Sequence, residues 1–256
     1  MLLKDKYGLG DLKTNNLTLK KYTLADFPLA KNNFVGFNSY IGIEVEVENI
    51  VLFQKPYLDN FAEFWDITKD GSLRNSGAEL ISVPLRGINI SGALNYLQHF
   101  LEVCHPDHDF SHRCGIHIHV NCRNLTLEQV NNIIFTYLCL ETVLFDQFVK
   151  NERSGNSFCM PVTDVFAGKK YHPCKYQALN RKCLGTLGTL EFRHLQGTKD
   201  IALIKRWIKI ITNLVTYASG KTYEELKDII NNLNTFSNYE QFVSDVIGPN
   251  NFVKLQ

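Results

Sequence analysis

The chain has 256 residues, of which 45% are hydrophobic and 21% are charged, and its formal net charge is +1. This composition is ordinary for a globular protein with a sizeable core. The near-zero charge gives the whole molecule no electrostatic bias toward nucleic acid or a membrane surface.

Cysteine usage and the N-terminal residues predict the compartment. The seven cysteines are scattered and form no CxxC pair, so neither a zinc ribbon nor a disulfide framework is indicated. The N-terminus has no apolar run of signal-peptide length, and no stretch reaches the roughly 18 apolar residues that cross a bilayer. We therefore expect a cytoplasmic protein with reduced thiols. The many Asn and Lys residues suggest an A+T-rich genome, and hence a bacterial cell or a phage-infected host.

The first half of the chain predicts three strands and a helix. Residues 1–38 are polar without a clear period, which predicts an irregular lead-in to a single domain over residues 39–256. YIGIEVEVE, residues 40–48, alternates Glu with Ile or Val, as a half-buried strand does. EFWDITKDGSLRNSGAELISVPL predicts two short strands joined through the turn signal KDGS. Ser91 is expected to cap a helix that runs to about residue 103.

The second half predicts two further strands and a helical end. HRCGIHIHVNCRNL and GTLEFRHL read as strands, with a loop expected over residues 151–175 between them. The capping boxes TLEQ, at residues 126–129, and TYEE, at residues 222–225, open helices to about residues 150 and 233. Further helices are expected at about 200–219 and 239–246. The strand–turn–strand order predicts an α+β fold with an antiparallel sheet.

Four of these strands carry polar side chains on one face, because residues two apart on a strand point to the same side. The intervening residues are Ile, Val, Leu or Phe, which suit the opposite, buried side. One such strand could simply be solvated, but four suggest a shared polar face. Its members are Glu44, Glu46, Glu48, Glu79, His117, His119, Glu191 and Arg193.

Carboxylates with one or two imidazoles form a metal-ligand set. Because the carboxylates outnumber the histidines, Mg²⁺ or Mn²⁺ is favoured over zinc. Such sites usually share the cation with substrate phosphates. Arg193 and the basic stretch 169–182 could supply a phosphate clamp. The basic residues of that stretch are Lys169, Lys170, Lys175, Arg181 and Lys182.

Each of these assignments has a structural alternative. The first strand could be a solvated face, the histidines could be satisfied core or surface residues, and the basic stretch could be a solvated loop. Glu191 and Arg193 could form an ion pair with each other. The segment HPDHDFSHRCGIHIH, residues 105–119, leaves a zinc site open.

The strand segments, taken together, resemble the amidoligase family, whose relatives are the glutamate–cysteine ligases and glutamine synthetases. The matching pieces are GIEVEVE, DGSL followed by AELISVPLRG, CGIHIHV, and YQALN followed by TLEFRHLQGT. They occur in this order and span about residues 40–198.

The resemblance implies a curved antiparallel sheet with helices on its outer face, and a concave face that holds ATP and divalent cations. The implied reaction joins a carboxylate to an amine while ATP is cleaved to ADP and phosphate. Arg193 would contact the transferring phosphate. Carried over residue by residue, the implied metal ligands are Glu44, Glu46, Glu79, His117 and Glu191. The implied ATP contacts include His117, His119, Asn180 and Arg193. Lys175 occupies the place of a basic residue before the tyrosine of the YQALN motif, and Arg181 follows that motif and is expected to contact ATP as well.

The chemistry also follows from the residue types. Phosphoryl transfer to a carboxylate makes an acyl phosphate and needs charge neutralisation more than covalent help. The attacking amine must then lose a proton, which Asp70 or Glu48 could accept. A metal-dependent hydrolase or nuclease on the same acidic face, or a non-catalytic nucleotide-binding relative, are the alternatives. The substrates would be a small-molecule or peptide carboxylate and amine, with a modified nucleotide left open, and the oligomeric state has no readable signature.

Overall fold

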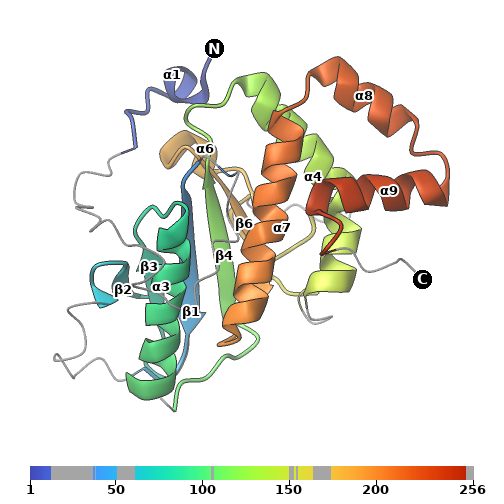
Figure 1. Cartoon of the computed structure of the whole chain (residues 1–256). Helices are drawn as coiled ribbons and strands as arrows, with labels where there is room; N and C mark the ends of the chain where they lie inside the picture. Colours follow the sequence, from blue (N-terminus) through green and yellow to red (C-terminus); the bar gives the residue numbers. More distant parts are fainter. Residues whose placement is uncertain are drawn as a thin grey trace.

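The protein has an α+β fold in which helices pack against a six-stranded antiparallel sheet (Figure 1). The computed structural model describes residues 1–12, 37, 39–50, 61–104, 107–149, 153, 155–163 and 174–251. The predicted α+β class with an antiparallel sheet is confirmed. No helix in these ranges combines the length and apolarity that a membrane-spanning segment needs.

The sheet places the predicted polar strands next to one another. Its strands are β1 (Ile41–Val47), β2 (Trp65–Lys69), β3 (Ala78–Ser82), β4 (Gly115–Asn121), β5 (Leu179–Asn180) and β6 (Thr189–Gln196). Their order across the sheet is β2-β3-β1-β4-β6-β5, with every neighbouring pair antiparallel. The glutamate-rich strand β1 thus lies between β3, which carries Glu79, and β4, which carries both histidines.

The helices begin and end largely where their capping residues predict. They are α1 (Leu3–Tyr7), α3 (Ile88–His99), α4 (Leu127–Phe148), α6 (Cys183–Thr186), α7 (Ile201–Ser219), α8 (Tyr223–Asn231) and α9 (Phe236–Ile247). Both capping boxes are formed, at Thr126 and at Thr222. Asp200 caps α7 by accepting a hydrogen bond from the backbone N–H of Leu203.

Two helix starts differ from the prediction. The predicted cap at Ser91 is wrong, since α3 begins at Ile88 and Ser91 is buried inside it. Gly87, with φ of 58°, makes the turn into the helix instead, a conformation that glycine adopts without strain. Helix α9 likewise begins three residues earlier than expected, because Thr235 accepts a hydrogen bond from the N–H of Asn238.

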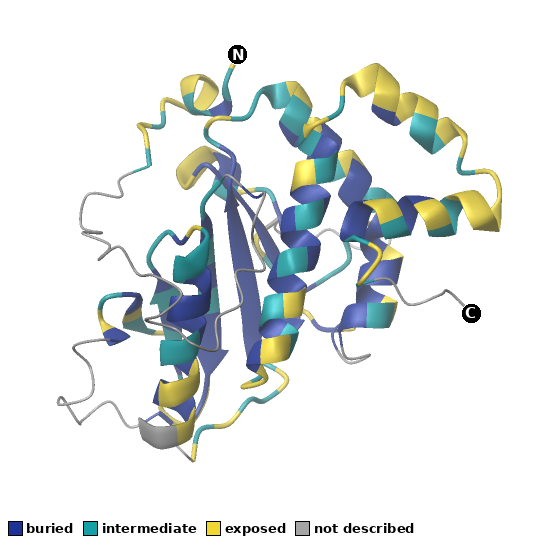
Figure 2. Cartoon of the chain, in the orientation of Figure 1, coloured by how far each residue is buried: buried dark blue, intermediate teal, exposed yellow. Residues whose placement is uncertain are grey.

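The apolar side of the sheet is covered by helices. Ile43, Val45 and Ile118 are fully buried, as alternation predicts. Helices α3 and α7 lie across this face in Figure 1, and Figure 2 shows the central strands as buried and both helices with buried and exposed residues. Burial of one such side chain stabilises the fold by roughly 1.5–3 kcal/mol. This packing fixes which face of the sheet is left for the carboxylates.

A β-bulge in β6 shapes the end of the polar face. Ile116 pairs with Leu195 and Ile118 with Phe192, so two residues of β6 stand opposite one residue of β4. The extra residue returns Leu195 to the buried side. Arg193 keeps the polar side, while the ring of His194 packs among the helices. Bulges often occur beside functional sites because they re-aim side chains.

The beginning of the predicted lead-in is attached to the body of the protein. The N–H of Leu3 donates to the carbonyl of Leu125 at 2.9 Å, and Leu3 is buried. Residues 3–7 form the short helix α1 rather than irregular chain. The rest of the lead-in, residues 13–36 and 38, lies outside the described residues, and the single-domain assignment stays a prediction.

Candidate functional site

Strand register brings the predicted polar residues together. Glu46 stands opposite Glu79, and Glu44 opposite His117. His119 stands opposite Glu191. Directly opposed residues on neighbouring strands have Cβ atoms about 4.5–5.5 Å apart, so these side chains interact. We call the six of them the acidic cluster: Glu44, Glu46, Glu79, His117, His119 and Glu191.

His117 is the centre of the acidic cluster and is only 1% exposed. Its Nδ1 lies 3.1 Å from Oε2 of Glu44 and 3.4 Å from Oε1 of Glu191. Its Nε2 lies 3.6 Å from Oε2 of Glu46. A neutral imidazole has a single N–H, so it cannot donate to all three carboxylates. The cluster therefore holds more negative charge than His117 can compensate.

Glu44 lies between the two imidazoles. Oε1 of Glu44 is 2.9 Å from Nε2 of His119, whose Nδ1 is 3.0 Å from the hydroxyl oxygen of Thr189. Burial by itself would raise the pKa of Glu44 and lower that of His119. The contacts outweigh burial, so the pKa of Glu44 is lowered and that of His119 is raised.

Glu79 shows the opposite behaviour. Burial and the charges of Glu44 and Glu46 raise the pKa of Glu79 to about 8. Glu79 is therefore the carboxylate whose ionisation most needs a positive partner.

Arg193 forms the ion pair that the sequence left open as an alternative. Its Nη1 donates to Oε1 of Glu191 and lies 3.3 Å from Nδ1 of His117. The other carboxylate oxygen of Glu191 accepts from Nδ2 of Asn180 and from the thiol of Cys183, at 3.3 Å. The predicted position of Arg193 on the polar face is thus correct, and Cys183 is a neighbour that sequence reasoning missed.

The acidic cluster has the spacing of a cation site. Three groups each offer ligand atoms within 4.8 Å of one another, and two ligand atoms held 2.0–2.6 Å from one cation cannot be more than about 5 Å apart. Two groups are rich in carboxylate and fit Mg²⁺ or Mn²⁺. The third contains a thiol whose pKa burial and Glu191 raise to about 12. The groups are Glu44–His117–Glu191, Glu46–Glu79–His117 and His119–Cys183–Glu191.

The sequence left open a zinc site formed by the histidines of residues 105–119, and the structure places these histidines in different surroundings. Among the described residues, the three cation groups use only His117 and His119 from that segment. The ring of His108 instead packs edge-on against Phe110, with centroids 5.3 Å apart. His105 lies outside the described residues.

Arg153 is a second arginine beside the acidic cluster, and sequence reasoning missed it. Its Nε donates to the carbonyl of His194 at 2.9 Å and its Nη2 to the carbonyl of Arg193 at 2.7 Å. A Cβ added at Gly115 would lie 2.9 Å from this Nη2 and 3.0 Å from Nε2 of His117. Residue 153 falls in a segment without periodicity, so no sequence pattern could have indicated it.

The two expected bases lie at the edge of the acidic cluster. Asp70 is in the turn after β2, where its carboxylate accepts from the N–H of Ser72 at 2.7 Å. Its charge contributes to the raised pKa of Glu79, so it lies nearby. Glu48 is buried at the end of β1, and its Oε1 accepts from the N–H of Arg74 at 2.8 Å.

The predicted phosphate clamp is only partly assembled. Asn180 contacts Glu191, as described above, and its Oδ1 accepts from the N–H of Lys182 at 2.9 Å. Lys175 is exposed, with Nζ 4.6 Å from the ring centre of Tyr176. Arg181 is half-buried and its Nε has no hydrogen-bond partner among the described residues. Lys169 and Lys170 lie outside those residues.

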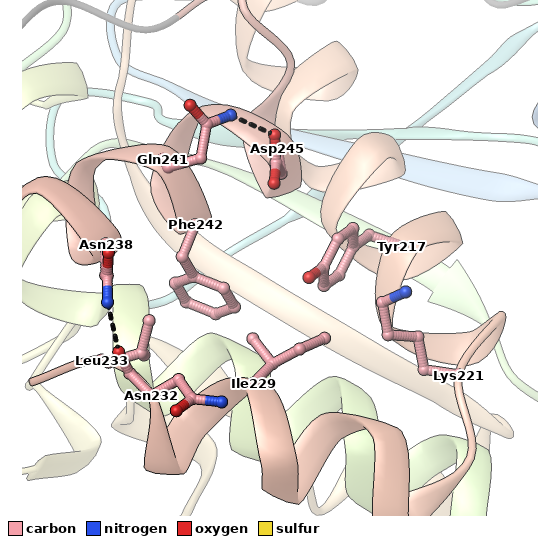
Figure 3. A pocket seen from close by; sticks show the side chains of 9 residues that line it. All are labelled: Tyr217, Lys221, Ile229, Asn232, Leu233, Asn238, Gln241, Phe242 and Asp245. Atoms are coloured by element: carbon pink, nitrogen blue, oxygen red, sulfur yellow. Dashed lines mark hydrogen bonds between the residues drawn. The ribbon is translucent and has the colours of Figure 1, made fainter.

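A cavity of about 460 Å³ lies elsewhere, between α7, α8 and α9. Figure 3 shows Phe242 and Ile229 among its lining side chains. Its one carboxylate, Asp245, accepts a hydrogen bond from Nε2 of Gln241 at 2.7 Å (Figure 3). This cavity offers no set of ligand atoms comparable to the acidic cluster.

Comparison with known proteins supports the resemblance drawn from the motifs. Residues 58–169 match the family described as "Putative amidoligase enzyme". No curated protein matches the chain. The matched region contains β2, β3, α3, β4 and α4, and hence Glu79, His117 and His119, whereas β1 and β6 lie outside it. The predicted resemblance is thus confirmed over residues 58–169, which match the amidoligase family model.

Proposed function

We propose that the protein is an ATP- and Mg²⁺-dependent carboxylate–amine ligase, with Mn²⁺ as a possible substitute. It would form an amide through an acyl phosphate and release ADP and phosphate. The family description implies a ligase, which favours this reaction over the hydrolase or nuclease alternative. The observation that carries the proposal is the convergence of four glutamates on His117, with Arg193 beside them.

Cations would bind on both sides of the His117 ring. Nδ1 faces Glu44 and Glu191, and Nε2 faces Glu46, so the two carboxylate groups share one imidazole. Because a neutral imidazole offers a lone pair on one nitrogen only, one position takes His117 and the other relies on carboxylate and phosphate oxygens. Divalent cations at these positions would neutralise the charge of the β- and γ-phosphates.

The remaining side chains receive supporting roles. A cation at Glu191 would displace the guanidinium of Arg193, which is then free for the γ-phosphoryl group. His119 would hold Glu44, and Asn180 would hold Glu191. Asp70, which is half-buried beside Glu79, is better placed to accept the amine proton than Glu48, which is buried.

The proposal also covers two basic residues near the phosphates and the shape of the polar face. Lys175 and Arg181 would reach the outer phosphates, because they flank β5, which pairs with the Glu191 strand. The polar face would be concave around the nucleotide. Small-molecule or peptide carboxylates and amines remain the expected substrates, in the cytoplasm.

The nucleotide products test the reaction. We expect amide formation to release ADP and phosphate in equal amounts, because cations bridging the phosphates favour attack on the γ-phosphorus. A screen of carboxylates against amines, read by ADP release, supplies the substrate pair. Formation of AMP and pyrophosphate with the cognate pair would reject the scheme.

Ligand-induced stabilisation tests the nucleotide site without a known substrate. A ligase should melt at a higher temperature with ATP plus Mg²⁺, and ATP at 100 times its dissociation constant stabilises by about 2.7 kcal/mol. A nuclease should respond to metal plus nucleic acid instead. A protein that responds to neither would be a relative without turnover.

Replacing Glu79 with glutamine should stabilise the metal-free protein. The change removes a carboxylate that stands opposite Glu46 and whose pKa is raised to about 8. At pH 7 folding therefore requires Glu79 to take up a proton, a cost that the neutral glutamine does not have. We expect the melting temperature in EDTA to rise by about 2–4 °C, the shift that about 1 kcal/mol gives in a protein of this size.

The same Glu79→Gln variant should lose much of the stabilisation that Mg²⁺ or Mn²⁺ gives the wild type. Glu224→Gln is the matched control, because Glu224 is exposed on α8 and pairs with Lys227. It should leave both melting temperatures unchanged. A Glu79→Gln protein that melts lower in EDTA and still responds fully to metal would remove Glu79 from the cation site.

A further inference from the structure

The polar face of the sheet continues past the acidic cluster into a cavity of about 230 Å³. Glu44 and His119 line its near end, so the cavity and the acidic cluster adjoin. Beyond them the wall becomes mostly apolar. Its main members are Tyr40, Gly42, Ile81, Pro84, Leu187 and Arg123.

The cavity has a glycine in its floor. Gly42 is two residues before Glu44 on β1, so both positions face the same side. A Cβ at Gly42 would meet only Cβ of His119, at an ordinary 3.5 Å. Position 42 lies in extended strand backbone that any residue can adopt. The absent side chain therefore leaves open space where a fold-compatible residue would fill it.

A cationic side chain without an acidic partner lines the far end. No carboxylate of the described residues lies within ion-pair distance of Arg123, and its Nε is buried without a hydrogen-bond partner among them. Its Nη1 makes a long contact, 3.4 Å, with Oδ1 of Asn121. Burial lowers the pKa of Arg123. A partly desolvated guanidinium of this kind is well suited to bind a carboxylate.

The backbone holds Arg123 in this place. Gly188 has φ of 67°, and a Cβ there would lie 2.6 Å from Cγ of Arg123. Glycine at 188 thus leaves room for the arginine stem to cross the chain. The orientation of Arg123 toward the cavity is built into the fold rather than left to a free surface side chain.

The size of the cavity limits the ligand. Sites for drug-sized ligands have about 300–1,000 Å³, so 230 Å³ favours a molecule of amino-acid size over a nucleotide. His119 and Asn121 are two residues apart on β4, which separates the two ends by roughly 7 Å. A short chain of four or five bonds spans that distance.

We propose that this cavity binds a small carboxylic acid with a short apolar stem, no larger than a single amino acid. Its carboxylate pairs with Arg123, its stem lies over Gly42, and its other end carries the group that is joined at the acidic cluster. The assignment as a carboxylate site stands on the cavity and Arg123. Its identity as the substrate site rests on the proposed ligase function.

Binding to the full-length protein tests the proposal. The probes are the twenty free L-amino acids and the linear C3–C6 mono- and dicarboxylic acids, each at about 10 mM, with binding followed by saturation-transfer NMR and calorimetry. We expect at least one acid to bind, and its primary amide, such as leucinamide for leucine, to bind at least tenfold more weakly. Arg123→Gln should weaken the acid by roughly 10–100-fold, because one charge-assisted pair is lost.

Pocket-filling variants locate the bound acid. Gly42→Val should abolish binding, whereas Gly42→Ala, which adds only the tolerated Cβ, should retain it within about threefold. Arg206→Gln is the charge control, because Arg206 is exposed on α7, donates to the carbonyl of Asn251 and does not line the cavity. Circular dichroism and thermal melts establish that each variant is folded.

The outcomes separate this proposal from the proposed function. Failure of every acid to bind, equal binding of acid and amide, or binding that survives Gly42→Val or Arg123→Gln would each overturn the carboxylate site. Stabilisation of the wild type by ATP plus Mg²⁺ is read independently. Its absence would reject the nucleotide-dependent ligase while leaving a carboxylate site that passes these tests in place.

Discussion

Replacing Arg193 with lysine should lower kcat for amide formation by about 10²–10³-fold and leave the protein folded with most of its ATP affinity. The guanidinium lies between Glu191 and His117, where phosphate would meet the cations. Its contact with the γ-phosphoryl group would be strongest as charge develops during transfer. Lysine keeps the charge but not the forked donor geometry, and removal of one transition-state donor typically has an effect of this size.

The structure makes the competing explanation concrete, because Arg193 pairs with Glu191. A structural ion pair predicts a lower melting temperature with activity per folded molecule nearly intact. Melting temperature and ADP release should therefore be measured on one preparation of the variant. Arg206→Lys is the control, since Arg206 lies on α7 and its guanidinium donates to the backbone carbonyl of Asn251. A destabilised but fully active Arg193→Lys protein would end the catalytic assignment.

Strand periodicity predicted the fold and the polar face well, because burial on one side of a sheet allows only one register. Alternation in β1 and β4 placed Glu44 and His117 on the same side, and antiparallel pairing then brought them together. Capping boxes predicted the starts of α4 and α8, because the hydrogen bonds of a capping box form within four consecutive residues. Ser91 failed as a cap because Gly87, four residues earlier, could make the turn at less strain.

Features that depend on contacts between distant segments could not be predicted. The bulge opposite His117 arises from the pairing of β4 with β6 and has no signature within either strand. The cavity over Gly42 needs Arg123 and Leu187 from other segments. The packing of Lys175 over Tyr176 likewise has no sequence signature, because a basic stretch does not indicate where each of its side chains lies.

Arg153 is expected to be the most stability-sensitive of the arginines near the site. Its guanidinium is 3% exposed and donates to three backbone carbonyls, those of His194, Arg193 and Cys114. Two of the three belong to the bulge in β6, so Arg153 fixes the segment that directs Arg193 to the polar face. The carbonyl of Cys114 also accepts from the N–H of Gly197, so the bonds that depend on Arg153 are those to His194 and Arg193. Lysine could satisfy only one of these two carbonyls well, and a buried carbonyl left unpaired costs about 1–3 kcal/mol.

Arg153→Lys should therefore lower the free energy of unfolding by about 1–3 kcal/mol, which corresponds to roughly 5 °C in melting temperature. Lysine keeps the positive charge beside Glu46, so a large loss would reflect the lost carbonyl bonds and not the charge. Arg113→Lys is the matched control, because Arg113 makes one such bond, to the carbonyl of Ser72 at 2.7 Å, and should cost less than about 1 kcal/mol. Urea denaturation gives both free energies, and amide hydrogen exchange reports whether the bulge at Arg193 and His194 opens before the rest of β6. Equal losses for the two variants, or a bulge that stays protected in Arg153→Lys, would show that β4 and β6 hold this geometry without the arginine.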